Sequence, residues 1–381
     1  MGRVRSALLS FLVAAVALAA SAEFLSFLYV RHVARLDWGP AWLAGPAEPQ
    51  RDAGFLIDTA PWGIWRRANA TSRFESACFA QTLAANAFGM NDVPREKQAG
   101  GRRRVVVLGD SFAEGWGVAR EARVSNILER ELGMEFLNFA IASAGPLQYQ
   151  MIYELLAADF AHDEVLVMLL PGNDFTDNDA ETWRRKPNRD FYQRHRRYYA
   201  QRADGGYDVI DPTREEGAQG AAPEPVRGID RRAERGWLNR LEKTVRDNLW
   251  LHRAIDHIKT LWGIGAGYSG YDDYTDAQFN AVVWSLRQIK ARAGGRPVSV
   301  AIAPRLNDFL RAARGGATRL PPALTAALAA DGIDVIDLLG PMRRAAPDPT
   351  ALFIPCDGHW TEAGNRLAAQ ALLAANPFTN R

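Results

Sequence analysis

Residues Val105-Val106-Val107-Leu108-Gly109-Asp110-Ser111-Phe112 decide the fold of this chain. Three β-branched residues followed by a leucine are typical of a strand that is buried on both faces of a parallel sheet. Gly109 permits a tight turn where the strand ends. The sequence therefore predicts that Ser111 is held at the edge of a sheet.

Similar apolar runs along the chain predict four further strands, at residues 136–139, 165–170, 298–302 and 333–336. Helix-like stretches lie between the runs, at residues 125–132, 277–293 and 322–330. Strands that alternate with helices indicate an α/β fold with a parallel sheet covered on both faces. In such sheets, ligands bind at the carboxyl ends of the strands.

The composition excludes several classes of protein. Of the 381 residues, 48% are hydrophobic and 24% are charged, which is unlike a disordered or fibrous chain. The 46 Lys and Arg residues and the 44 Asp and Glu residues leave a formal net charge of +2, so no nucleic-acid partner is expected. The two cysteines have no metal-binding spacing, and no metal or other cofactor is predicted.

Residues 1–30 are predicted to be a membrane anchor or a signal peptide. Glu23 is the one charged residue from Ala7 to Val30, and a helix of this length would span about 36 Å. An uncleaved anchor is favoured because the apolar run continues to Tyr29 before Arg31 interrupts it. The small residues Ala20-Ser21-Ala22 support the alternative of cleavage and secretion. Both interpretations export the rest of the chain, to the periplasmic side for an anchor.

The rest of the chain is predicted to consist of a lead-in, residues 31–100, that wraps over an α/β body, residues 101–381. The body carries an insertion at 176–275, far longer than a plain crossover requires. Within the insertion, basic and aromatic residues crowd together: Trp183, Arg184, Arg185, Lys186, Arg189, Phe191, Tyr192, Arg194, Arg196, Arg197, Tyr198, Tyr199 and Arg202. They indicate either a solvated basic surface or a lid that binds an anionic or sugar-rich substrate.

Two further elements are predicted inside the insertion. Asp204-Gly205-Gly206 predicts the turn of a hairpin. Residues 237–262 predict an amphipathic helix, for which packing against the core is favoured over membrane contact.

Polar motifs follow two other predicted elements. The third strand runs into Pro171-Gly172-Asn173-Asp174, which places a side-chain amide at the edge where Ser111 is expected. Asp357-Gly358-His359 precedes the last predicted helix, at residues 361–375, so that a histidine and a carboxylate lie two positions apart.

Together these motifs resemble the SGNH (GDSL) serine-hydrolase superfamily. Gly109-Asp110-Ser111-Phe112 is similar to its first block, Gly172-Asn173-Asp174 to its third and Asp357-Gly358-His359 to its last. The resemblance covers Val105 to about Ala375. It implies a three-layer α/β/α, flavodoxin-like fold with a five-stranded parallel sheet. It also implies ester hydrolysis or acyl transfer through a serine, without a metal.

In this resemblance Ser111 is the nucleophile, His359 its base and Asp357 the carboxylate that orients the imidazole. The Ser111 backbone N–H and the Asn173 amide are expected to bind the oxyanion. The family's second block corresponds to residues 138–145, where the usual glycine falls on Ser143, with Gly145 as the alternative donor. The short Asp-x-His spacing resembles the alginate O-acetylation proteins of the superfamily. Asp110 is expected to brace the turn, and Asp174 to cap a helix.

The resulting hypothesis is an exported serine esterase that acts on O-acyl groups, with acetyl favoured, of an envelope or exopolysaccharide carbohydrate. An O-acyltransferase with the same triad, a lipid esterase or thioesterase, and a non-catalytic carbohydrate-binding scaffold are the alternatives. The sequence does not indicate protein partners or an oligomeric state. A disulfide between Cys78 and Cys356 is predicted because the compartment is oxidising, with two buried thiols as the alternative.

Overall fold

The computed structural model describes residues 2–34, 40, 54–75, 79–184, 191–213, 244–245, 248–262, 268–315, 318–346, 348–355 and 357–378. Cys78 and Cys356 lie outside these residues, so their disulfide stays a prediction.

The centre of the fold is a five-stranded parallel sheet with the strand order β11-β10-β7-β5-β6. Its strands are β5 (Arg104–Gly109), β6 (Glu135–Asn138), β7 (Glu164–Leu169), β10 (Val298–Ile302) and β11 (Ile333–Asp337). Every residue of β5, β7 and β10 is buried, as their unbroken apolar runs predict. The predicted parallel sheet is confirmed, and each strand differs from its predicted range by at most one residue at either end.

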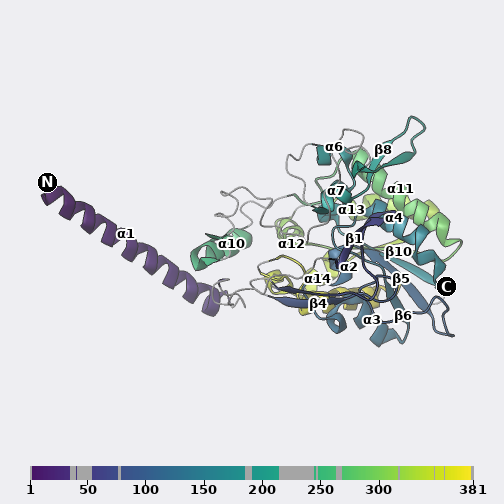
Figure 1. Cartoon of the computed structure of the whole chain (residues 1–381), viewed down its shortest axis with the longest axis horizontal. Coiled ribbons are helices and arrows are strands. Elements are labelled where there is room, and N and C mark those ends of the chain that lie inside the picture. Colours follow the sequence, from purple (N-terminus) through teal and green to yellow (C-terminus); the bar gives the residue numbers. More distant parts are fainter. Residues whose placement is uncertain are drawn as a thin grey trace.

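Helices cover the sheet on both faces, which gives the three predicted layers (Figure 1). One group packs together as α4 (Pro146–Leu155), α11 (Asp276–Ala293) and α13 (Leu320–Leu328). A second group contains α3 (Val124–Leu132), α12 (Leu306–Ala313), α14 (Leu339–Ala345) and α15 (Glu362–Ala375). Short helices begin directly after two strands: α2 (Ser111–Glu114) follows β5, and α5 (Pro171–Asp177) follows β7.

The lead-in forms two antiparallel hairpins that its sequence pattern does not predict. They pair β1 (Leu56–Ala60) with β2 (Gly63–Arg66), and β3 (Thr71–Glu75) with β4 (Ala80–Ala84). Trp62 and Trp65 are buried in the main core, and their rings meet edge to face. The first hairpin is therefore part of the core.

Arg66, the last residue of β2, is buried against α2 and the loop after β6. Its guanidinium donates to the carboxylate of Glu114 at 2.5 Å and to the carbonyl of Ala140 at 2.8 Å. The side chains of Arg66 and Glu114 are 1% and 2% exposed, so each charge depends on the other for its compensation.

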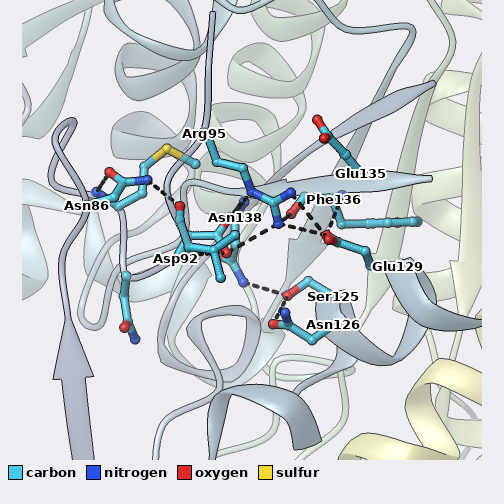
Figure 2. Close-up of polar contacts among 12 residues, drawn as sticks. Asn86, Asp92, Arg95, Ser125, Asn126, Glu129, Glu135, Phe136 and Asn138 are labelled. Carbon is cyan, nitrogen blue, oxygen red and sulfur yellow. Dashed lines mark hydrogen bonds and ion pairs between the residues drawn. The ribbon is translucent and has the colours of Figure 1, made fainter. Parts of the chain in front are cut away.

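A second buried network joins the lead-in to the sheet (Figure 2). Arg95 donates to Asp92 at 2.9 Å and to Glu129 of α3 at 2.7 Å. Asn138, at the end of β6, donates to Ser125 of α3 and to the carbonyl of Ala113 in α2. The loop after β6 is thus tied to α2, to α3 and to the lead-in.

The insertion contains the predicted hairpin and a helix that ends where the prediction 237–262 ends; residues 237–243 and 246–247 of that range lie outside the described residues. Strands β8 (Tyr198–Gln201) and β9 (Tyr207–Ile210) pair antiparallel, and Gly205 in their turn has a φ of 83°. Two short helices, α6 (Ala180–Arg184) and α7 (Phe191–His195), precede the hairpin. Helix α10 spans Trp250–Trp262 and packs against α1. Helix α10 also contacts α12 of the body, and the Trp262 carbonyl at its end accepts from the Arg314 guanidinium, so it packs against both the body and the N-terminal helix.

Helix α1 (Gly2–Leu28) continues into a π-helical segment, Tyr29–Val33. The apolar stretch Leu9–Val33 is long enough to cross a membrane and is almost entirely unburied. A signal sequence meets the same criteria of length and composition, so the segment is consistent with both predicted interpretations.

We expect Arg66→Ala to lower the free energy of unfolding by about 3–5 kcal/mol, because it leaves the Glu114 carboxylate buried without its cation. Urea unfolding of the purified full-length chain measures the change. Arg73→Ala is the matched control, since Arg73 and Glu75 form an ion pair at a similar distance with the Arg73 side chain 64% exposed. Loss of the control pair is expected to cost about 0–1 kcal/mol. Equal effects of the two substitutions would contradict the role of the buried pair.

Candidate active site

Ser111 stands at the first turn after the central strand β5. Asp110 caps helix α2 by accepting a hydrogen bond from the Phe112 N–H at 2.9 Å. A Cβ atom at Gly109 would lie 2.5 Å from the Cβ of Ala113, so only glycine lets the chain turn this tightly. The Ser111 backbone N–H, at the first helical position, has no intrahelical acceptor.

His359 and Asp357 meet Ser111 from the far end of the chain. The Nε2 atom of His359 lies 2.7 Å from the Ser111 hydroxyl oxygen, although 248 positions separate them. The Nδ1 atom of His359 is bonded to the Asp357 carboxylate. The three predicted residues are therefore brought together in the order Ser–His–Asp.

The loop before α15 holds the histidine in this position. Ile354 closes the loop twice, because its N–H donates to the His359 carbonyl and its carbonyl accepts from the Gly358 N–H, each at 2.7 Å. Gly358 has a φ of 93°, a conformation that strains other residues, so a glycine between the acid and the histidine suits this turn. The ring of Phe112 lies 4.8 Å from the imidazole, centroid to centroid, and fixes the ring plane from the side of α2.

The pKa of Asp357 lies below its ordinary value. Burial alone would raise the pKa of this carboxyl group, but the hydrogen bond and charge of His359 outweigh burial, and Trp116 adds a further hydrogen bond. Asp357 is thus held ionised beside the imidazole, as a residue that stabilises an imidazolium must be.

The loop after β6 leaves a single backbone N–H unused among residues 142–145. Ala142 donates to Glu114 at 2.6 Å, Ala144 to the carbonyl of Ile141 at 3.1 Å, and Gly145 to the side chain of Gln148 at 3.0 Å. Ser143 has no acceptor among the described residues, and its φ of 65° is in the left-handed region. This geometry favours Ser143 over Gly145 as the available donor.

The Ser143 N–H lies between two backbone groups, the Ala142 N–H and the Ser143 carbonyl. Each of these groups is hydrogen-bonded to a side chain that belongs to an ion pair. On one side, the Ala142 N–H is bonded to Glu114, which Arg66 holds. On the other side, Arg196 donates to the Ser143 carbonyl at 2.6 and 3.0 Å and pairs with Asp177 at 2.7 Å. The left-handed conformation of Ser143 is therefore maintained by charges from the lead-in and from the insertion.

Asn173 lies at the same edge of the sheet, in the first turn of α5. Its Nδ2 atom donates to the Asp110 carboxylate at 3.2 Å, which leaves the second N–H of this amide for another acceptor. Its side-chain oxygen is buried and has no partner among the described residues.

Comparison with known proteins identifies the fold family. Residues 309–378, which include Asp357 and His359, match the family described as the SGNH hydrolase-like domain of the acetyltransferase AlgX. This part of the chain is therefore similar to an SGNH hydrolase-like domain. No curated protein matches the sequence.

Solved structures with a GDSL or esterase description are among those that match the chain. A GDSL-family lipolytic protein from Veillonella parvula is 13% identical with a TM-score of 0.36, and the match covers 73% of this chain and 100% of that protein. An acetyl xylan esterase from Geobacillus stearothermophilus, solved as a single-residue variant, is 12% identical with a TM-score of 0.36, and the match covers 75% of this chain and 100% of that protein. These values are too low for the likeness to indicate an activity or a substrate here.

The carboxylates of Asp110 and Asp174, close to Ser111, are deeply buried. Burial raises the pKa of Asp110 to about 6, although the Phe112 N–H, the charge of His359 and the Asn173 amide all favour its ionised form. Burial and the charge of Asp110 also raise the pKa of Asp174, which accepts from the Tyr149 hydroxyl at 2.8 Å and from the Leu170 N–H at 2.7 Å. Asp110 braces the turn, as predicted, and Asp174 ties α5 to the end of β7.

The sequence did not single out the charged residues that hold the loop after β6. Glu114 and Arg66 are separated by 48 positions, and Arg196 lies in a run of arginines that is equally typical of a solvated surface. The described side chains contain no group of three or more His, Cys, Asp or Glu residues arranged to hold a metal ion.

The raised pKa of Asp110 predicts a pH-dependent cost of folding. Below the ordinary pKa of 3.8 the carboxyl is protonated in both states, so it has no effect on stability. As the pH rises from 3.8 to about 6, the carboxyl ionises in the unfolded state but not in the folded state, so stability falls over this range and is constant above it. Asp110→Asn should therefore become more stable than the wild type by up to about 3 kcal/mol above pH 7 and show little difference near pH 4.

Urea unfolding of both proteins between pH 4 and pH 8 tests this prediction. Asp204→Asn serves as the control of opposite sign, because the Gly206 N–H and Arg202 hold the pKa of the exposed Asp204 below its ordinary value. A stability difference between Asp110→Asn and wild type that is constant with pH would contradict a raised pKa in the native protein.

Proposed function

We propose that the protein is a serine esterase that removes O-acyl groups, with acetyl as the preferred acyl group. The observation that carries the proposal is the contact of the Ser111 hydroxyl with Nε2 of His359, whose Nδ1 is bonded to Asp357. A serine is a weak nucleophile until a base removes its proton, and this arrangement supplies the base and orients it.

In the proposed reaction, the Ser111 oxygen attacks the ester carbonyl while His359 takes the serine proton. The ester C–O bond then breaks, His359 returns the proton to the leaving alkoxide, and an acyl-serine remains. Water attacks the acyl-serine with His359 as the base again. The products are the carboxylic acid, the alcohol and the free serine.

Three N–H groups are proposed to stabilise the oxyanion: the backbone groups of Ser111 and Ser143 and the side-chain amide of Asn173. The support is that each lies at the carboxyl edge of the sheet with a hydrogen that no described residue accepts. Donors that are fixed before the reaction lower the barrier because the site does not reorganise as charge develops.

An O-acyltransferase is the second candidate. The description of the family that matches residues 309–378 names an acetyltransferase, which favours this alternative. The same triad would form the same acyl-serine, and a sugar hydroxyl would replace water in the second step. Product analysis with an added carbohydrate acceptor distinguishes the two reactions.

The proposed substrate is an acylated carbohydrate of the cell envelope, and the proposed location is the outer face of the membrane. The support is the apolar segment Leu9–Val33, which would export the remaining chain. In this proposal, residues 1–30 form the anchor, residues 31–100 the lead-in and residues 101–381 the catalytic domain with its insertion at 176–275.

The first test of the activity removes the triad. Ser111→Ala and His359→Ala should each lower kcat for p-nitrophenyl acetate by about three orders of magnitude or more, and Asp357→Asn by less. Far-UV circular dichroism confirms that each variant is folded. Wild-type turnover by Ser111→Ala would end the nucleophile assignment. An inactive wild type would favour the carbohydrate-binding scaffold.

The second test concerns the oxyanion. Asn173→Ala should cost about 2.7–4 kcal/mol of transition-state stabilisation, as does the loss of another side-chain oxyanion donor, with kcat reduced and KM little changed. Asn178→Ala is a comparison at the end of α5, since this buried amide bonds Gln148 and the Arg197 carbonyl rather than the site. A normal kcat for Asn173→Ala would remove its amide from the mechanism.

A further inference from the structure

Helix α10 (Trp250–Trp262) packs against the last part of the N-terminal apolar segment and runs at an angle to it (Figure 1). The ring of Trp250 packs edge to face on Phe27, with 5.0 Å between ring centroids. Val30 is completely buried and packs with Ala254. The contacts run from residue 23 to residue 30 of the N-terminal helix, so α10 follows it for about 11 Å at 1.5 Å per residue.

Polar groups support this packing at both ends. The Glu23 carboxylate accepts a hydrogen bond from the Trp250 N–H at 2.9 Å, at the amino end of α10. The Tyr29 hydroxyl lies 3.0 Å from Nδ1 of His257, one and a half turns further along the apolar segment. A carboxylate within an apolar span is costly unless it is paired, and the positive end of a helix dipole is a favourable partner. Helix α10 thus supplies the partner of the one charged residue between Ala7 and Val30.

A second face of α10 is apolar and exposed. Leu251, Ile255, Ile258 and Trp262 follow one another at i, i+4, i+7 and i+11, and so form a single stripe along the helix. Leu251 is 37% exposed, Ile255 39% and Trp262 71%. This stripe is adjacent to the face formed by Trp250, Ala254 and His257, which contacts the N-terminal helix.

The position of the stripe indicates what covers it. The segment Leu9–Val33 is the part of the chain that would cross a bilayer, and α10 packs against residues 23–30, in its second half. The stripe therefore lies at the depth where the segment leaves the hydrocarbon. Trp262 at its end and the exposed Lys259 at its margin are residue types that favour the boundary between acyl chains and headgroups.

We propose that α10 is an interfacial helix that lies in the headgroup layer of the membrane, with the stripe Leu251–Ile255–Ile258–Trp262 against the acyl chains. The proposal rests on the proposed membrane anchor. It gives the insertion a function beyond substrate binding: α10 is a second membrane contact, and with the N-terminal helix it sets the orientation of the catalytic body above the bilayer.

The test places an environment-sensitive fluorescent amino acid at one position at a time in the full-length chain. The protein is reconstituted in vesicles of phosphatidylcholine and phosphatidylglycerol, with and without bromine on the acyl chains as a quencher. The probe positions are Ile255 on the stripe, Val16 in the apolar segment and Val209 on β9, which is 46% exposed and belongs to the hairpin far from α1 in Figure 1. Circular dichroism and thermal unfolding confirm that each labelled chain is folded.

Brominated chains should quench the probes at Ile255 and Val16 about twofold or more, and leave the probe at Val209 unchanged. Quenching at Val16 without quenching at Ile255 overturns the proposal and leaves the anchor intact. If the Ile255 probe is also shielded from aqueous iodide in that case, a protein surface and not lipid covers the stripe. Absence of quenching at both positions overturns the anchor together with the interfacial helix. None of these readings depends on the esterase activity, so the two proposals fail independently.

Discussion

The arrangement of this site depends on one constraint: β5 and β7 are parallel neighbours and end at the same edge of the sheet. Gly109 of β5 is in register with Met168 of β7, so the turns that follow the two strands are adjacent at the edge of the sheet. Ser111 and Asn173 therefore share this edge through backbone geometry alone, and the loop of His359 has only to close over them. In the proposed mechanism, this geometry brings the Ser111 nucleophile to its oxyanion donor without the movement of a lid.

Charge burial is the second organising feature. Four carboxylates surround the turn after β5 and the loop after β6: Asp110, Glu114, Asp174 and Asp177. Glu114 and Asp177 are paired with arginines, and these pairs fix the backbone around the Ser143 N–H that is proposed to bind the oxyanion. Asp110 and Asp174 instead accept hydrogen bonds from N–H and hydroxyl groups. Such pairs rarely add stability over apolar packing, so their presence here is better explained by the geometry that they impose.

The sheet and the triad could be predicted from the sequence because their signals are local. An unbroken apolar run predicts a buried strand, and Ser111, Asn173 and His359 each lie directly after or before a predicted element. The residues that hold the loop after β6 have no such signal, since Arg66, Glu114 and Arg196 come from three distant segments and become partners only in the fold. Helix α10 was predicted as amphipathic, but periodicity does not tell which apolar surfaces a helix meets, and its neighbours are α1 and α12.

The buried contact of Arg66 with Glu114 has a consequence for how this chain can be divided. A fragment that begins at residue 101 contains every strand of the sheet and every residue of the triad. It also contains Glu114 without its cation, and a core surface that Trp62 and Trp65 no longer cover. The smallest autonomous unit therefore begins before β1 at Leu56, and a recombinant soluble form should retain both hairpins. A fragment that folds independently therefore begins earlier in the sequence than residue 101, where the sequence motifs alone would place its start.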